Sequence, residues 1–270
     1  MDRGELVAIP KLAQSQSWFL FDELLRRDIS HRYRGSLGGF AWALAQPLFM
    51  LAIYTVVFGF IFKPRWPGMQ TGWDYVVVLF LGKIPYIFTQ ESIGRAPVLI
   101  VSHANYVKRL RFPLHLLPLV AVASAFFYAM VAYVIWIAFY VAIRHEFSLL
   151  VFVAPLLYLP LALFALGGCW FLASMGTYFK DTLQVVQPVV FGLMFMSPIF
   201  YPMAAVPPRL AHLMRLNPLT YPIEELRGLL LFGEPFHANQ YLAQACAGLA
   251  VALLGYAWFQ RTRSGFADVV

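Results

Sequence analysis

Charged residues are scarce in this sequence. Only 12 % of its 270 residues are Asp, Glu, Lys or Arg, whereas soluble domains carry about 25 %. Apolar residues make up 61 % of the chain, and the mean hydropathy is +0.69. This composition excludes an ordinary soluble domain and predicts an integral membrane protein.

Patterns that bind metals, form disulfides or carry out catalysis are also lacking. The two cysteines, Cys169 and Cys246, lie far apart in apolar surroundings, which indicates buried thiols. There is no GxxxxGK[ST] phosphate loop and no HExxH or GxSxG motif, and the six histidines fall at or near the ends of apolar runs. We therefore expect no catalytic residue, no metal and no cofactor, and we expect no cleaved signal peptide at the charged N-terminus.

Long apolar runs are what the sequence has instead. A membrane helix needs about 20 mostly apolar residues, and the chain contains six runs that qualify. We predict spans at Gly38–Phe62, Tyr75–Ile93, Leu114–Ile143, Leu149–Phe179, Val185–Tyr201 and Tyr241–Phe259.

Two further segments complete the predicted fold. Residues 18–30 place charged side chains on one arc of a helical wheel and apolar ones opposite, which is typical of a helix lying in a membrane interface. Residues 202–240 are too apolar for a free loop and too interrupted by proline to span, so we expect a re-entrant hairpin with short helices at Leu210–Leu216 and Ile223–Phe232. The sequence therefore predicts an all-α membrane protein with six spans. Its two parts are a cytoplasmic segment, 1–37, and a transmembrane domain, 38–270.

The distribution of Lys and Arg predicts the orientation. With the N-terminus in the cytoplasm, thirteen of the twenty Lys and Arg residues fall on the cytoplasmic side and six on the other, and Lys83 lies within a span. Cytoplasmic loops of membrane proteins carry this excess of positive charge. Both termini are therefore expected in the cytoplasm, and the net charge of +7 does not require a nucleic-acid partner.

Several side chains within the spans allow two interpretations. Aromatic residues recur every four positions, as Tyr54 and Phe58 do and as Phe191 and Phe195 do; such stripes either pack or face lipid, or they line a passage on which sugar rings stack. Lys83 and Glu91 either reach the headgroups or face a polar cavity. The basic residues before the first span either set the topology or bind phosphate.

Five stretches in this order resemble the membrane subunits of ABC transporters that export cell-surface polysaccharides such as O-antigen, capsule and teichoic acid. They are "RDISHRYRGSLGGFAWALAQPL", "NYVKRLRFPLHLLPL", "MSPIFYP", "NPLTYPIEELRGLLLFGEP" and "SGFADVV", and together the resemblance covers nearly the whole chain. The stretch "LGKIPYIF" departs from the family, which more usually has an uncharged run there, so the resemblance assigns no role to Lys83.

The resemblance implies a homodimer in the inner membrane that binds two copies of a separate ATPase and moves a polyprenyl-diphosphate-linked polysaccharide. It places the coupling loop at 94–111 and gate helices in the 202–240 hairpin. The resemblance and the patterns above together give three sets of candidate site residues. Candidates for lipid-diphosphate binding are Arg26, Arg27, Arg32 and Arg34; for lining the channel, Tyr54, Phe58, Tyr86, Phe88, Phe191 and Phe195; and for ATPase coupling, Arg95, Asn105, Lys108, Arg109, Lys180 and Asp181.

Two other functions stay open from the sequence. One is a permease for drugs or another lipid, and the other is a membrane-embedded enzyme that modifies glycans. An enzyme would act in liposomes without an ATPase, whereas a transporter subunit alone would be inert.

Because the chain has no phosphate loop, we predict that the purified chain neither binds nor hydrolyses ATP. ATPase activity should require an added partner subunit, and substitutions in the 94–111 loop should uncouple that activity from transport. Saturable ATP binding by the chain alone, measured by equilibrium dialysis, would contradict this.

Overall fold

The computed structural model describes residues 18–30, 32, 39, 41–62, 66, 71–107 and 112–270, and within these residues every regular element is a helix. Five helical segments of the described chain are long and apolar enough to cross a membrane: Ala41–Ile61, Gly72–Val98, Leu116–Arg144, Ala154–Tyr178 and Ala238–Val269. The predicted all-α membrane fold is therefore confirmed. The domain division at residue 37 lies outside the described residues and stays a prediction.

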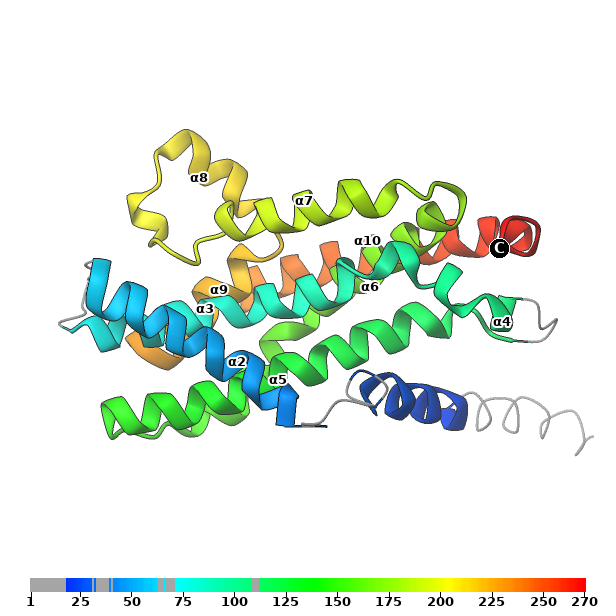
Figure 1. The fold of residues 1–270 in the computed structure, drawn as a ribbon. Helices are drawn as coiled ribbons and strands as arrows, with labels where there is room; N and C mark the ends of the chain where they lie inside the picture. Colours follow the sequence, from blue (N-terminus) through cyan, green and yellow to red (C-terminus); the bar gives the residue numbers. More distant parts are fainter. Residues whose placement is uncertain are drawn as a thin grey trace, which may run out of the picture.

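The helices that make up these segments are largely antiparallel and lie side by side (Figure 1). They comprise α2 (Ala41–Tyr54, continuing as a π-helix over Thr55–Phe62), α3 (Gly72–Ile93), α5 (Leu116–Arg144), α6 (Tyr158–Tyr178, preceded by the 3₁₀ turns Leu149–Phe152 and Ala154–Leu157) and α10 (Ala238–Thr262), followed by the 3₁₀ turn Arg263–Gly265 and α11 (Phe266–Val269).

The fifth predicted span, Val185–Tyr201, corresponds to α7 (Thr182–Phe195), which has 14 residues. At 1.5 Å per residue it is about 21 Å long, shorter than the ~30 Å hydrocarbon core of a bilayer. It ends early because turns follow at residues 196–199. Figure 1 shows α7 returning beside α6 and α3, so its path resembles that of a span, but the count of six stays a prediction.

The central helix is α3, which packs against α2, α5, α6, α7 and α9. Its N-terminus has a capping box in which the Thr71 hydroxyl accepts from the Asp74 N–H and the Asp74 carboxylate accepts from the Thr71 N–H. Asp74 also pairs with Arg144 at the end of α5, at 3.0 Å. Almost all of its residues from Asp74 to Phe88 are buried, which fixes α3 as the element against which the others are positioned.

Glycine allows the closest helix pair, α6 with α10. A Cβ atom at Gly167 would overlap the α10 backbone at Val251, and one at Gly255 would overlap the α6 backbone at Gly167. Small residues at such crossings let two membrane helices approach until their backbones touch.

The helix over residues 18–30 forms as predicted and lies against the start of α5. Its Leu24 packs on Leu116 and Val120. Trp18 and Phe19 are 67 % and 74 % exposed, so this end of the helix keeps an apolar surface for lipid.

The segment between α7 and α10 contains α8 (Pro208–Arg215) and α9 (Thr220–Arg227, continuing as a π-helix over Gly228–Phe232). The two predicted short helices are therefore present, each beginning two or three residues earlier than predicted. Figure 1 shows α8 projecting from the bundle, whereas α9 lies within it. Leu219, Ile223 and Leu226 are fully buried. Whether this pair re-enters the membrane stays a prediction.

Arg227, at the end of α9, lies inside the protein and is 2 % exposed. Its guanidinium donates to the carbonyls of Val78 (3.0 Å), Ile199 (2.8 Å) and Pro198. It also lies 4.8 Å from the Trp66 ring centroid. A methyl group at Gly82 would overlap the guanidinium, so α3 needs glycine there to admit it. Arg227 thus connects α9, α3 and the turn after α7.

Replacing Arg227 by Met should lower the free energy of unfolding by about 3 kcal/mol, because the turn carbonyls of Pro198 and Ile199 lose their donor at ~1–3 kcal/mol each. The measurement is SDS-induced unfolding of the purified chain in mixed micelles. Arg215→Met on the exposed α8 is the matched control and should change stability little. Equal stability of both variants would show that the Arg227 contacts are dispensable.

Candidate functional site

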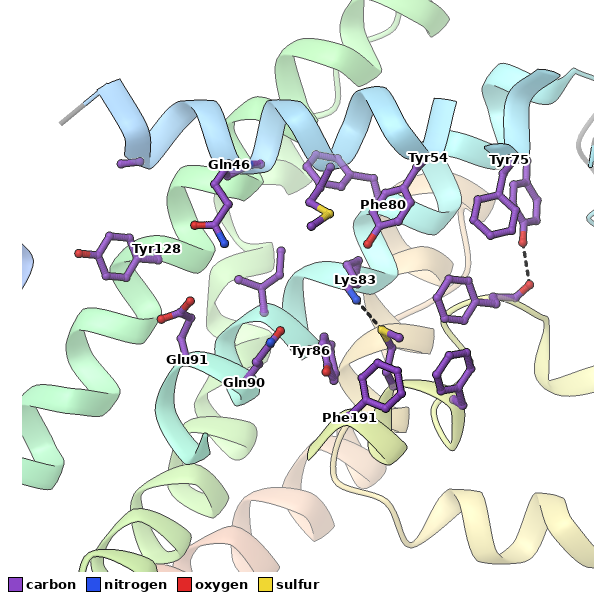
Figure 2. A pocket seen from close by; sticks show the side chains of 18 of the residues that line it. Gln46, Tyr54, Tyr75, Phe80, Lys83, Tyr86, Gln90, Glu91, Tyr128 and Phe191 are labelled. Carbon is purple, nitrogen blue, oxygen red and sulfur yellow. Dashed lines mark hydrogen bonds between the residues drawn. The ribbon is translucent and has the colours of Figure 1, made fainter. Parts of the chain in front are cut away.

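A cavity of about 860 Å³ lies between α2, α3, α7 and the turn that follows α7. Figure 2 shows side chains from these elements pointing into it. Its volume is within the ~300–1,000 Å³ typical of ligand sites. The lining includes Ala43, Gln46, Met50, Tyr54, Phe58, Tyr75, Lys83, Tyr86, Gln90, Glu91, Tyr128, Phe191, Met194, Phe195, Phe200 and Tyr201.

The structure brings five of the six predicted channel aromatics to this cavity, namely Tyr54, Phe58, Tyr86, Phe191 and Phe195. Phe200 joins the two stripes, because its ring lies 5.9 Å from Phe58 and 5.7 Å from Phe195. Tyr54 continues the row on α2 at 6.4 Å from Phe58, and Phe191 continues it on α7 at 5.5 Å from Phe195. The result is a continuous row of rings that runs from α2 through the turn after α7 to α7 itself.

The sixth residue, Phe88, was predicted wrongly. Its side chain is fully buried, with ring centroids 6.5 Å from Phe126 and 6.3 Å from Tyr158. Residues two apart on a helix point in different directions, so Tyr86 and Phe88 could not both face the cavity.

Lys83 contributes a cationic side chain to the same cavity, near its centre (Figure 2). Its ammonium group lies 2.6 Å from the sulfur of Met194 and 4.2 Å from the centroid of the Tyr86 ring. Its side chain faces this cavity and not the outer surface, since 9 % of the residue is exposed.

A second cavity, of about 640 Å³, lies between the helix over residues 18–30, the end of α3, and α5. Its wall is charged, with Arg27, Asp28, Arg32, Glu91 and Arg95 among the lining residues. Arg32, Glu91 and Tyr128 line both cavities. The two cavities therefore meet at this group of three side chains.

Arg32 and Glu91 form a two-bonded ion pair, with oxygen–nitrogen distances of 2.5 and 2.8 Å. The guanidinium lies over the Tyr128 ring, 4.6 Å from its centroid. The planar guanidinium group of arginine can form two parallel hydrogen bonds either to a carboxylate or to a phosphate. A phosphate entering either cavity could thus replace Glu91 as the partner of Arg32.

The other predicted diphosphate ligands lie in different settings. Arg27 lines the charged cavity and donates to the Tyr106 hydroxyl at 3.0 Å. Arg26 pairs with Asp22 on its own helix and lines neither cavity. Arg34 lies outside the described residues.

The predicted residues for ATPase coupling also lie in different settings. Asn105, on α4 (Ala104–Val107), and Lys180 and Asp181, between α6 and α7, are exposed at one end of the molecule (Figure 1). Lys108 and Arg109 lie outside the described residues.

Arg95 lies in a different setting from the exposed candidates for ATPase coupling. It donates to both oxygens of Asp28, at 3.1 and 2.9 Å, to the Ala121 carbonyl at 3.0 Å and to the Ser124 hydroxyl. These bonds hold the helix over residues 18–30 on α5, and they occupy the guanidinium that a coupling contact would need.

Sequence reasoning missed Tyr128, Gln46 and Gln90 as cavity residues. Each is a polar or amphipathic side chain within or at the end of an apolar run, and that signal could have singled them out. Which of several such residues face one another depends on helix packing, which the sequence does not show.

The family of the chain follows from its sequence. The sequence model of the ABC-2 type transporter family matches residues 20–231, so the chain belongs to that family and is a transporter membrane subunit.

Two relatives give a more particular comparison. An O-antigen export system permease protein RfbA of Klebsiella pneumoniae is 23 % identical over 258 residues, covering 93 % of this chain and 96 % of the relative. A protein of the same name from Myxococcus xanthus is 21 % identical over 253 residues, covering 93 % and 95 %.

The ion pair at the junction of the cavities should hold the N-terminal helix in place. Reversing one charge, in Arg32→Glu or Glu91→Arg, should raise amide hydrogen exchange over residues 18–30 about threefold, as expected for a partly exposed pair. Combining both substitutions should restore the wild-type rate. The control Arg26→Gln, which removes an exposed pair within the helix, should exchange almost normally. Failure of the double variant to recover would show that the two side chains act independently.

Proposed function

We propose that this chain is the membrane-spanning subunit of an ATP-driven exporter that translocates a lipid-linked polysaccharide, O-antigen or a similar cell-surface glycan, across the inner membrane. The observation that carries the proposal is the row of aromatic rings along the 860 Å³ cavity, which adjoins a cavity with a charged wall. The family membership and the names of the relatives support the same function.

The aromatic row suits a sugar chain that must slide. A sugar presents an apolar ring face that stacks on Tyr or Phe while its hydroxyls stay solvated, and stacking does not demand the fixed geometry of a hydrogen-bond network. Five rings spaced 5.5–6.4 Å apart, from Tyr54 to Phe191, offer repeated weak contacts of equal kind. Bulky rings also close the path to ions between transport cycles.

The charged cavity suits the diphosphate of the lipid carrier. Arg27 and Arg32 border it, and the helix that carries Arg27 keeps an apolar end for the lipid surface. The diphosphate would replace Glu91 as the partner of Arg32. Loss of the Arg32–Glu91 pair would then open the junction between the two cavities. We keep Arg34 as a further ligand from the sequence, and we drop Arg26 because it lies away from the cavity.

The exporter would be a homodimer with two copies of a separate ATPase. Asn105, Lys180 and Asp181 are exposed at one end of the bundle, together with α4 and the C-terminus (Figure 1), and they are the proposed contacts of the ATPase. The excess of Lys and Arg assigns this end to the cytoplasm, with both termini there.

The proposal is tested by replacing Phe191 and Phe195 with Ala in the chain reconstituted with its ATPase in proteoliposomes. Glycan transport should slow by about tenfold and ion leakage should rise, because the rings both contact sugar and close the path. Partner-dependent ATP hydrolysis should stay largely intact.

The matched control replaces Val185 and Val189, which are exposed on the same helix but line neither of the two cavities described, with Ala. That variant should transport normally without leakage. If the Phe variant does not leak, the rings only pack; if the chain modifies glycan without an ATPase, it is an enzyme and the proposal fails.

A further inference from the structure

The 860 Å³ cavity has a cationic site at Lys83 that the aromatic row does not explain. A charged amine within a membrane span is costly unless a partner compensates it. Lys83 is 9 % exposed, and a Met of similar length would fit the same apolar surroundings at lower cost. The position therefore carries a charge where packing alone does not require one.

Within the described residues, no carboxylate compensates Lys83. The acidic side chain lining the same cavity, Glu91, is already bonded to Arg32 through both oxygens. Glu91 is also eight residues further along α3, which is about 12 Å. Arg32, Lys83 and Glu91 together leave the charged groups of the cavity with one excess positive charge.

The contacts that Lys83 makes leave it able to bind a further group. An ammonium group has three N–H donors, and the described residues supply one acceptor, the Met194 sulfur. The face of the Tyr86 ring stabilises the positive charge without a conventional hydrogen bond, so N–H donors of the ammonium group remain for a further acceptor. Figure 2 shows the amine directed into the space between α2 and α7, among the rings.

We propose that Lys83 is a binding site for anionic groups on the transported glycan, so that the substrate of this chain is an acidic polysaccharide carrying carboxylate or phosphate along its length. Each acidic residue would pair with the ammonium group while its sugar ring contacts Tyr86 or Tyr54. The inference rests on the proposed function, since it names the chemical class of glycan that occupies the same cavity.

The test is binding of short probes to the full chain in lipid nanodiscs, measured by isothermal titration calorimetry at low ionic strength. Tetragalacturonate should bind about tenfold tighter than neutral maltotetraose, as one charge-assisted contact adds about that much. The Lys83→Met variant should lose this preference and keep its affinity for maltotetraose. Lys83→Arg should retain the preference, and added salt should weaken it.

Gln46→Met is the matched control, because it removes a polar but uncharged side chain from the same cavity. It should keep the preference for tetragalacturonate. Size-exclusion profiles should show that all variants are folded, since each substitution introduces a side chain of similar length.

Inorganic pyrophosphate distinguishes an acidic sugar from the carrier diphosphate as the source of the negative charge. If Lys83→Met weakens pyrophosphate binding but not tetragalacturonate binding, the site belongs to the lipid carrier and the inference is overturned. Equal affinity of the wild-type chain for both tetrasaccharides, or a preference that persists in Lys83→Met, also overturns it and leaves the proposed function standing. Binding of neither tetrasaccharide would overturn both.

Discussion

The buried guanidinium of Arg227 is the interaction on which the rest of the structure depends. It donates to the Val78 carbonyl on α3 and to the carbonyls of Pro198 and Ile199 in the turn after α7, which lie outside any helix and have no intrahelical partner. The Tyr75 hydroxyl donates to the Phe200 carbonyl in the same turn, at 2.7 Å. Together these bonds hold Phe200 where its ring joins the aromatic stripes of α2 and α7. The continuous row therefore depends on a cation that is not itself part of the cavity.

The two ends of the 860 Å³ cavity are held by arginines in different environments, and this difference matters for function. Arg227 is almost fully buried, so removing its partners would leave an uncompensated charge. Arg32 is about one third exposed and Glu91 about one fifth, so water can replace either partner at modest cost. The end near Arg227 is thus fixed, whereas the junction at Arg32 can exchange its carboxylate for an incoming anion.

The sequence predicted what periodicity and local chemistry determine, and it failed where packing decides. Long apolar runs located five spans, although the last one continues to Val269, ten residues beyond its predicted end. The helix α7 was predicted too long because an apolar run does not show where turns end a helix. Stripes on one helix predicted Tyr54, Phe58, Phe191 and Phe195 correctly as neighbours. Phe88 failed because its direction depends on how α3 is rotated against α5 and α6. Arg95 was placed in the coupling loop and Arg227 in a short helix of the hairpin, yet both donate to main-chain carbonyls that no sequence pattern identifies.

The helix α2 buries few of its residues against the rest of the protein, so the cavity beside it could be closed in one state and open in another. Ala43 and Leu51 are the buried residues of α2, and its other face is exposed and apolar. Lipid or a second copy of the chain must cover that face, since water would not. Few contacts oppose a movement of α2 away from α3 and α7, whereas α3 itself is fixed by packing on several sides. The Lys83 charge stays on the fixed wall during such a movement. Such a movement would widen the cavity for the proposed glycan without displacing Lys83, its proposed binding site.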